Sequence, residues 1–359
     1  MKKTKAAILI LSNSWGGAEE SVFNIARYIN KKDLSLTLFV NKFLYERYKE
    51  IKNIEIVNLG TYNSDNKIKK ACSLAKVAIS LFDQSKKQKI GVLHIQLESS
   101  ILAYWYIRRL LKMPIVLTLR GDEARIYQDP KSLEQKIISS AIFSILNVKR
   151  NCVTSVSKWL VKDFDERDRS KIIITPNGID LERFKPVKVK KIKESILYVG
   201  RFVPGKGIED LVKIAGILKE YEFFFVGRGE LSGLMILKNT HDLGFKLYDE
   251  IIRLYSKVEI CVFPSYAEGM PMVGLEAMAC ECPVIASEAG FSDYIDNGAD
   301  GVIIKAGNID MIKNRILRLM KNKSLRIKIG RNARRKALNY DINKTVDNYL
   351  RLYKKMGIR

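Results

Sequence analysis

Two glutamates eight residues apart, Glu268 and Glu276, have side chains well suited to binding the hydroxyls of a sugar. A carboxylate accepts hydrogen bonds on both oxygens, so it can bridge two vicinal hydroxyls. A proline follows Glu268 closely, and its fixed φ and missing N–H suit the start of a helix. The free N–H groups and the dipole of such a helix start favour an anion such as a phosphate. The expected helix start comprises Gly269, Met270, Pro271 and Met272.

Two cations, Arg201 and Lys206, lie in one glycine-rich loop. A guanidinium fork and an ammonium point charge together suit a diphosphate, although two solvated loop cations are the alternative. A second candidate is the pair Gly16 and Gly17, where the backbone could approach a phosphate or sugar closely. The spacing there is not Gly-x-Gly-x-x-Gly, so the fingerprint of nicotinamide-dinucleotide binding is absent.

All of these candidates follow short apolar segments that alternate with helical patterns, which is typical of parallel sheets in doubly wound α/β domains. Ligands of such sheets bind at the carboxyl ends of the strands, so residues 14–19, 96–99 and 120–123 are expected on one rim. The first half has predicted strands at 5–11, 35–40, 54–59, 92–96, 115–119, 152–156 and 171–175. Its predicted helices cover 18–30, 65–88, 99–112, 131–147 and 157–164.

The same pattern restarts after Pro176-Asn177-Gly178-Ile179-Asp180, which predicts a second α/β domain. Its predicted strands are 196–199, 223–226, 260–263, 283–286 and 301–304, and basic helices follow from Met311 onwards. With 359 residues the chain has room for two domains, each with its own core. The expected boundaries are 1–180 and 181–340.

The net charge of +24 is concentrated at the two ends of the chain. Residues 1–180 hold 31 Lys and Arg against 18 Asp and Glu, and residues 311–359 hold 16 against 2. A basic surface of this kind suits a polyanion such as anionic lipid or nucleic acid, and lysines that only improve solubility are the alternative. No apolar run is long enough to span a bilayer. The five scattered cysteines indicate reduced thiols in a cytoplasmic protein.

Three segments combine apolar or aromatic residues with cations, as amphipathic segments on anionic membranes do. They are 67–89, 315–336 and the run from Tyr104 to Arg109. The alternative for the two helices is that the apolar stripe packs on the sheet while the lysines face water.

Several short motifs resemble, in this order and at these separations, those of the retaining GT-B glycosyltransferases of the family 4 (group 1) type. The likeness covers nearly the whole chain. The motifs are Gly-Gly-Ala-Glu at 16–19, Pro-Asn-Gly-Ile-Asp at 176–180, Val-Gly-Arg at 199–201 with Lys206-Gly207, and Pro-Ser-x-x-Glu-Gly at 264–269 with Glu276.

The resemblance implies a GT-B architecture, in which the parallel sheets of two Rossmann-like domains face one another across a cleft. The first domain, joined by a C-terminal helix at 341–359, would bind the acceptor, and the second would bind the nucleotide sugar. Arg201 and Lys206 would neutralise the diphosphate without a metal or cofactor. Glu268 would contact the transferred sugar and Glu276 the ribose, while Gly16 and Gly17 would approach the diphosphate.

The chain departs from the family pattern after the strand at 115–119. Relatives often have a histidine there that reaches the donor sugar, whereas this chain has Arg120-Gly121-Asp122. Arg120 cannot act as a proton shuttle but could hold a hydroxyl or phosphate, and Asp122 is the better candidate for a base. His94, at the end of another strand, is expected to be structural. Asp293 stands where many relatives have a glutamate.

The expected function is therefore a retaining, metal-independent hexosyltransferase that uses a UDP- or GDP-linked sugar as substrate. Its acceptor would be a polysaccharide or lipid-linked glycan of a bacterial surface, such as capsule or lipopolysaccharide. The protein would attach peripherally to the anionic inner face of the cell membrane, and no nucleic-acid partner is expected. Two alternatives are a nucleotide-sugar epimerase of the same architecture and a non-catalytic basic protein that binds membranes or polyanions.

Overall fold

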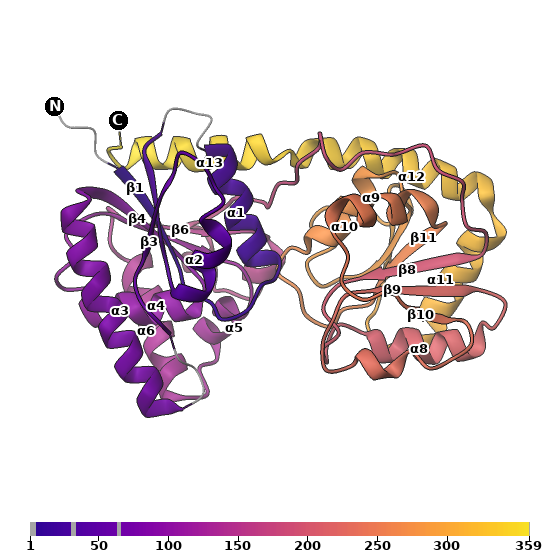
Figure 1. Cartoon of the computed structure of the whole chain (residues 1–359), viewed down its shortest axis with the longest axis horizontal. Coiled ribbons are helices and arrows are strands. Elements are labelled where there is room, and N and C mark those ends of the chain that lie inside the picture. The colour runs from indigo at the N-terminus through magenta and orange to yellow at the C-terminus, as the bar shows by residue number, and fades with distance from the viewer. Residues whose placement is uncertain (1–4, 30–33, 63–65, 359) are drawn as a thin grey trace. The chain divides into compact units, whose positions relative to one another are not determined.

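The computed structural model describes residues 5–29, 34–62 and 66–358 (Figure 1). The chain divides into two compact units, one of residues 1–177 and 342–359 and the other of residues 178–341. The first division, after residue 177, falls three residues before the expected boundary at 180, and the second, after residue 341, falls one residue after the expected boundary at 340. Asn30 and Asp65, at the ends of two expected helices, lie outside the described residues, as does the N-terminal segment 1–4.

The first unit is built on a parallel sheet of seven strands in the order β3-β2-β1-β4-β5-β6-β7. Apolar residues fill both faces of its central strands, as expected for strands covered on both sides by helices. The strands are β1 (Lys5–Ile10), β2 (Leu36–Val40), β3 (Glu55–Asn58), β4 (Ile90–Gln96), β5 (Ile115–Leu119), β6 (Cys152–Ser155) and β7 (Ile172–Ile174). The helices are α1 (Gly17–Ile29), α2 (Lys42–Tyr48), α3 (Lys67–Lys87), α4 (Glu98–Ile107), α5 (Asp122–Gln128), α6 (Leu133–Leu146), α7 (Glu166–Arg169) and α13 (Ile342–Lys355).

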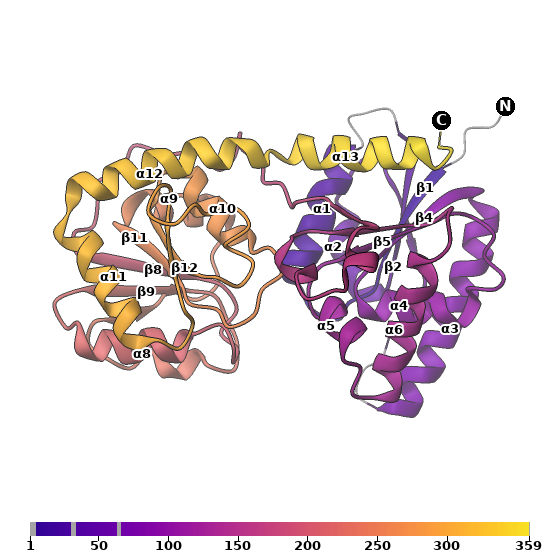
Figure 2. The same cartoon turned by 180° about the vertical axis from the view of Figure 1, so that it is seen from behind.

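Alternate residues of β1 enter two separate cores, because successive side chains of a strand point to opposite faces. Leu9 packs in a core with α3, α4 and α6, whereas Ile8 packs in a second core with α1, α2 and α13. Figure 2 shows α13 beside α1 in this unit. The C-terminal helix therefore completes the covering of the first sheet, although it is far from that sheet in sequence.

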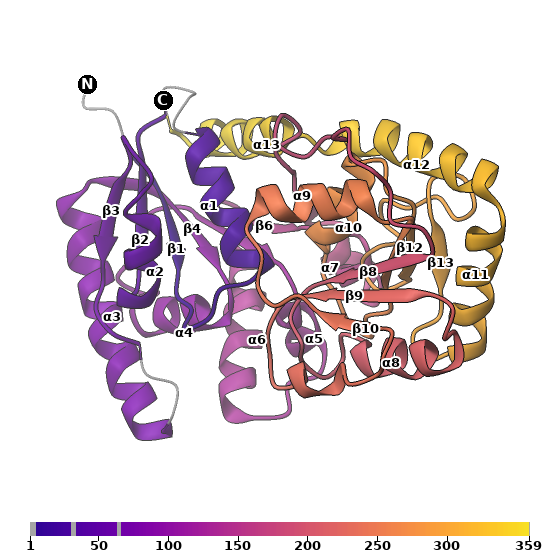
Figure 3. The ribbon, with the colours of Figure 1, turned by 45° about the vertical axis from the view of Figure 1, so that its right-hand side comes forward.

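The second unit has a parallel sheet of six strands in the order β10-β9-β8-β11-β12-β13. Figure 3 shows α8 on one side of β8 and β9 and α9 on the other. The strands are β8 (Ser195–Val199), β9 (Glu222–Val226), β10 (Thr240–Asp242), β11 (Ile260–Phe263), β12 (Val284–Ser287) and β13 (Val302–Ile304). The helices are α8 (Ile208–Ile217), α9 (Tyr248–Lys257), α10 (Met272–Ala279), α11 (Ile309–Lys321) and α12 (Lys323–Ala337). Both expected α/β domains are thus confirmed.

One expected helix is wrong. Residues 157–164 form a single 3-10 turn at Trp159–Val161, because serine hydroxyls bind the local backbone in place of helical carbonyls. The Ser157 Oγ accepts the N–H of Leu160 at 3.2 Å, and the Ser155 Oγ donates to the Ser157 carbonyl at 2.8 Å. Three short helices, α2, α5 and α7, and the edge strand β10 were not expected from sequence.

The amphipathic helices at 67–89 and 315–336 bury their apolar stripes within their own units. Leu74, Val77 and Leu81 of α3 belong to the core of the first sheet. In α11, Ile312, Ile316 and Leu319 are buried. No helix of the described residues is both long enough and apolar enough to cross a bilayer.

Candidate functional site

In the second unit the strand order reverses between β8 and β11, and the loops that follow these two strands pack directly on each other. Gly207 has a φ of 74°, and a Cβ atom there would lie 2.4 Å from the carbonyl oxygen of Pro264. The Tyr266 N–H donates to the Gly205 carbonyl at 2.8 Å. The glycines of the first loop are therefore needed for close backbone contact with the second, at the point where such sheets bind ligands.

This packing places Lys206 beside Glu268, as an ion pair with 2.5 Å between Nζ and Oε1. Each side chain is 18% exposed, so the pair is partly shielded from water yet open to a ligand. The exposed guanidinium of Arg201 makes no hydrogen bond or ion pair with the residues that the structure describes. A cation–carboxylate pair with a free arginine in the same loop can bind a diphosphate and a sugar hydroxyl together.

The Tyr198 hydroxyl supports this loop by donating to the Arg201 carbonyl at 3.1 Å. Burial raises the pKa of Tyr198, and the nearby Glu268 carboxylate raises it further. The phenol therefore stays neutral and acts as a donor.

Helix α10 begins one residue later than the sequence predicts, with Pro271 as its N-cap and Met272 as its first helical residue. Its start is anchored by the Tyr294 hydroxyl, which donates to the Pro271 carbonyl at 2.7 Å. Gly290, with a φ of 70°, packs so closely that a Cβ atom would lie 2.6 Å from the Gly269 carbonyl oxygen. Met270 and Met272 are buried, so this segment offers a ligand mainly its backbone.

Glu276 lies on the second turn of α10 and is only 6% exposed. The Tyr255 hydroxyl lies 3.4 Å from its Oε2 atom. Burial and the Glu276 charge both raise the pKa of Tyr255, so this hydroxyl remains a hydrogen-bond donor to the carboxylate.

In the first unit the strand order reverses between β1 and β4; Gly16 ends the turn after β1, and Gly17 is the first residue of α1. The Gly16 N–H donates to Oε2 of the buried Glu19 at 3.0 Å, which caps the start of α1. Neither glycine has a positive φ. A Cβ atom on Gly17 would meet no described atom within 4 Å. Neither the backbone conformation nor the packing of the described atoms requires glycine at 17, so this position leaves open space at the rim.

Arg120 is 7% exposed and sits at the carboxyl end of β5. Its Nε donates to Gln96 Oε1 at 2.5 Å, and its Nη1 donates to Asn177 Oδ1 at 2.9 Å and to Ser21 Oγ at 3.1 Å. Its Nη2 has no hydrogen-bond partner among the described residues, although it is shielded from solvent. Asn177 belongs to the Pro-Asn-Gly-Ile-Asp motif, for which sequence reasoning assigned no role.

His94 is fully buried, as its structural role predicts. Its Nδ1 lies 2.6 Å from the Tyr353 hydroxyl, and its Nε2 lies 2.6 Å from Thr118 Oγ1 and 2.7 Å from Gln96 Nε2. Burial and the Arg120 charge hold the pKa of His94 well below its ordinary value. The neutral ring therefore joins α13 to the sheet and supports the Gln96–Arg120 contact.

Asp122, the candidate base, begins α5 and is 63% exposed, with its Oδ1 3.1 Å from Arg125 Nη2. The next residue, Glu123, is buried, and its Oε2 accepts the Gly121 N–H at 2.8 Å. Glu123 thus fixes the turn, while Asp122 stays available at the rim.

Sequence reasoning placed Glu98 within the rim range but assigned it no role. Leu97, the residue before it, has φ 69° and ψ 156°, a region almost confined to glycine, which costs about 1–3 kcal/mol. This strained turn starts α4 with Glu98 at the carboxyl end of β4. Burial, followed by the charges of Glu123 and Asp122, raises the pKa of Glu98 to about 7. A carboxyl group that is half protonated near neutrality can donate or accept a proton there.

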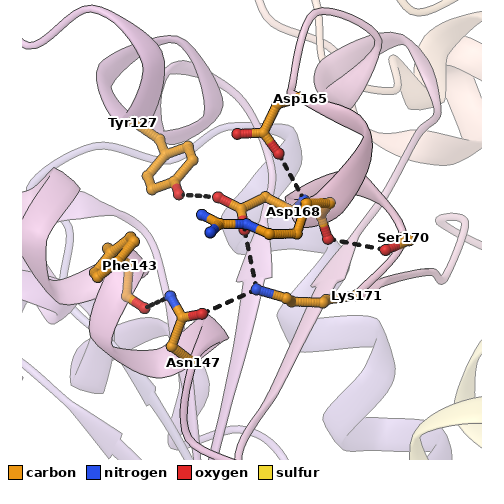
Figure 4. Close-up of polar contacts among 8 residues, drawn as sticks. Tyr127, Phe143, Asn147, Asp165, Asp168, Ser170 and Lys171 are labelled. Carbon is orange, nitrogen blue, oxygen red and sulfur yellow. Dashed lines mark hydrogen bonds and ion pairs between the residues drawn. The ribbon is translucent and has the colours of Figure 1, made fainter.

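Helix α5, which starts with Asp122, is held by a polar cluster around Asp168 (Figure 4). The Tyr127 hydroxyl donates to Asp168 Oδ2 at 2.5 Å, and Lys171 Nζ lies 3.0 Å from Oδ1. The hydrogen bond from Tyr127 lowers the pKa of Asp168, and Lys171 lowers it further. Lys171 also donates to Asn147 at the end of α6. The cluster thus positions the rim without belonging to it.

Two family models match the chain and together cover residues 15–336. The model described as Glycosyltransferase Family 4 matches residues 15–183, and the model described as Glycosyl transferases group 1 matches residues 180–336. They meet within a few residues of the division between the two units.

The chain is 28% identical over 308 residues to the UDP-Gal:alpha-D-GlcNAc-diphosphoundecaprenol alpha-1,3-galactosyltransferase of Escherichia coli, covering 77% of this chain and 79% of that protein. It is 31% identical over 202 residues to the N,N'-diacetylbacillosaminyl-diphospho-undecaprenol alpha-1,3-N-acetylgalactosaminyltransferase of Campylobacter jejuni, covering 50% of this chain and 53% of that protein. The structure of Anabaena Alr3699/HepE in complex with UDP-glucose has the same fold, with a TM-score of 0.80, 17% identity, and coverage of 98% and 99%. The chain therefore belongs to the GT-B glycosyltransferases of the group 1, family 4 type.

Proposed function

We propose that this glycosyltransferase moves a hexosyl unit from a UDP- or GDP-linked sugar to a lipid-linked or polysaccharide acceptor in bacterial surface glycan synthesis. The observation that carries the proposal is the Lys206–Glu268 pair at the rim of the second sheet, with the free Arg201 in the same loop. The two cations can neutralise the charge of a nucleoside diphosphate, and the carboxylate can accept hydrogen bonds from the hydroxyls of the attached sugar.

In the proposed donor complex, Arg201 and Lys206 bind the diphosphate and stabilise the negative charge that develops as the sugar leaves. Lys206 exchanges part of its contact with Glu268 for a phosphate oxygen, which frees Glu268 to accept a sugar hydroxyl. Glu276 accepts the ribose hydroxyls, and residues 269–272 contribute backbone N–H groups. Because the chain supplies two cations of its own, transfer is expected to proceed without a divalent metal.

The first unit is proposed to bind the acceptor. Gly17 leaves open space at its rim, and Arg120 keeps one Nη2 donor without a partner among the described residues. Glu98 and Asp122 supply carboxylates for an acceptor hydroxyl. The named activities of the E. coli and C. jejuni relatives, both on diphosphoundecaprenol-linked sugars, support an acceptor of this class.

Retention of the anomeric configuration is part of the proposal and rests on the family resemblance. It implies that the acceptor attacks on the face from which the diphosphate leaves. Attachment to the inner face of the membrane follows from a lipid-linked acceptor together with the basic first unit.

The test is a panel of UDP- and GDP-sugars incubated with the full chain and EDTA, with and without extracts of undecaprenyl-diphosphate-linked glycans. We expect one donor to release its nucleoside diphosphate slowly alone and faster with acceptor. NMR of the product should show the anomer of the donor.

Two results would contradict the proposal in different ways. Release of an epimerised nucleotide sugar without acceptor would identify an epimerase. Absence of any donor turnover and of nucleotide binding, together with binding to polyanions that weakens steeply with salt, would identify a non-catalytic protein.

A further inference from the structure

The first unit contains a pocket of about 400 Å³ at the opposite end of its sheet from the rim described above. It lies at the end of α4, beside α6, and reaches Ile115, the first residue of β5. Arg120 follows the last residue of this five-residue strand, so roughly 15 Å of strand separates the two places. A group bound in the pocket is therefore separate from the reacting sugar and its diphosphate.

Three arginines line the pocket: Arg108, Arg109 and Arg150. Arg108 stacks on Trp105 with its Cζ 3.3 Å from the ring centroid, and its Nη1 donates to the Trp105 carbonyl at 2.6 Å. Burial and the charge of Arg109 lower the pKa of Arg108. Within the described part of the chain, Arg109 and Arg150 have no ion pair or hydrogen bond. Three cations thus converge with no counter-charge.

The other polar side chains of the pocket, which include the Tyr104 hydroxyl, are neutral and can donate hydrogen bonds. Ser140 and Ser144, one turn apart on α6, are among its lining residues, and each has a hydroxyl that can donate a hydrogen bond. Asn151 lines it as well, and its Oδ1 already accepts the Ile115 N–H at 3.0 Å, which leaves its amide N–H groups for a ligand. No acidic side chain is among the described residues that line the pocket. Such a set of cations and neutral hydrogen-bond donors, without a carboxylate, matches a phosphate group.

Apolar side chains at the edge of this pocket indicate which kind of molecule carries the bound phosphate. Val148 lines it and is 38% exposed, and Leu110, between two lining residues, is 57% exposed. Lys112 and Lys149 add exposed charges beside them. Cations next to exposed apolar and aromatic groups are typical of surfaces that meet the boundary between lipid headgroups and acyl chains.

We infer that this pocket binds the phosphate headgroup of an anionic phospholipid and attaches the first unit to the membrane. This inference rests on the proposed function in one respect: an enzyme that acts on lipid-linked acceptors works at a lipid surface. It adds to that function the site through which the first unit attaches to the membrane. The run from Tyr104 to Arg109, which sequence reasoning singled out, provides the stacked Trp105–Arg108 wall.

The test measures flotation of the full chain with phosphatidylcholine vesicles that contain or lack phosphatidylglycerol. The pocket variant is Arg108→Gln with Arg109→Gln and Arg150→Gln. The matched control, Lys328→Gln with Arg331→Gln and Arg335→Gln, removes the same charge from one exposed face of α12. We expect the pocket variant to lose about tenfold or more in affinity for the anionic vesicles and the control to lose less than about threefold.

Equal losses in both triple variants would show that diffuse charge attracts the membrane and would overturn the inference, as would unchanged binding in the pocket variant. Calorimetry with inorganic phosphate and glycerol phosphate forms a second arm. If these soluble anions bind the pocket while vesicles do not, it is a small-anion site and the lipid assignment is wrong. Hydrolysis of a soluble donor should be unchanged in the folded pocket variant, so failure here is distinguishable from failure of the proposed transferase activity.

Discussion

Substitution of Lys206 and substitution of Glu268 should have different effects on nucleotide binding, although the two residues form one ion pair. In the ligand-free protein each neutralises the other across 2.5 Å. If Lys206 binds diphosphate and Glu268 binds sugar, Lys206→Met should weaken the binding of UDP or GDP about tenfold or more, since a charge-assisted contact is lost. Glu268→Gln should leave that binding equal or tighter, because it removes the group that competes for the lysine.

The magnitudes follow from the burial of the pair. With side chains only 18% exposed, the coupling energy of the pair should exceed the roughly 0–1 kcal/mol measured for solvent-exposed pairs. A double-mutant cycle from urea unfolding should therefore give about 1–2 kcal/mol. Turnover of the accepted donor should fall about 10²–10³-fold in Lys206→Met, as for other charge-stabilising groups.

The assays are calorimetric titration with UDP and GDP and donor hydrolysis, on each variant and on the control Asp296→Asn. That control breaks the 2.7 Å ion pair between Lys336 and Asp296, and the Asp296 side chain is 68% exposed. It should change neither nucleotide binding nor donor hydrolysis. Turnover of Glu268→Gln within a few-fold of the parent would refute the site assignment. Equal loss of nucleotide binding in Lys206→Met and Glu268→Gln would refute the division of roles.

Three further variants test the first unit. Gly17→Ala should keep the unfolding free energy within about 0.5 kcal/mol, because nothing described fills the space, but should lower transfer rates measured with donor and acceptor. As pH rises from the ordinary pKa of a glutamate to about 7, Glu98→Gln should become more stable than the parent. The expected gain is about 1 kcal/mol after allowing for the partial exposure of Glu98, and urea unfolding at several pH values measures it. Arg120→Lys should lower the unfolding free energy by about 1–3 kcal/mol, because Gln96 and Asn177 lose a shared donor.

The sign for Glu98 follows from proton binding. The folded chain holds this proton up to about pH 7, whereas the unfolded chain releases it near its ordinary pKa, so the parent loses stability as pH rises between these values. A Glu98→Gln difference that is constant with pH would contradict the raised pKa. A Gly17→Ala protein with parental transfer would mean that the glycine serves no ligand. An Arg120→Lys protein of parental stability would mean that the buried network contributes little.

The sheets were predictable because each buried strand reads as an apolar run and each candidate site residue follows one. Ile8 and Leu9 illustrate why the runs are continuous, since alternate residues enter different cores on the two faces. The short helix α5 was missed because the apolar pattern over Asp122–Gln128 is brief. Its position depends on the hydrogen bond from its Tyr127 to Asp168, 41 residues further along the chain.

The proximity of the candidate residues was predictable where they lie on loops after neighbouring strands, as Lys206 and Glu268 do. The order of strands brings such loops together regardless of their distance along the chain. The raised pKa of Glu98 could not be predicted, because burial and the charges of Glu123 and Asp122 depend on tertiary packing. The buried network of Arg120 likewise joins Ser21, Gln96 and Asn177, which no local pattern connects.

The proposed role of the rim of the second unit is to bind the diphosphate of a sugar donor through its own cations. Its most direct test is calorimetric titration of the full chain with UDP and GDP in EDTA, beside the double variant Arg201→Gln with Lys206→Met. We expect one nucleotide to bind the parent without metal and the double variant to lose about 100-fold or more in affinity. Absence of binding to either nucleotide, or equal binding by parent and double variant, would contradict it.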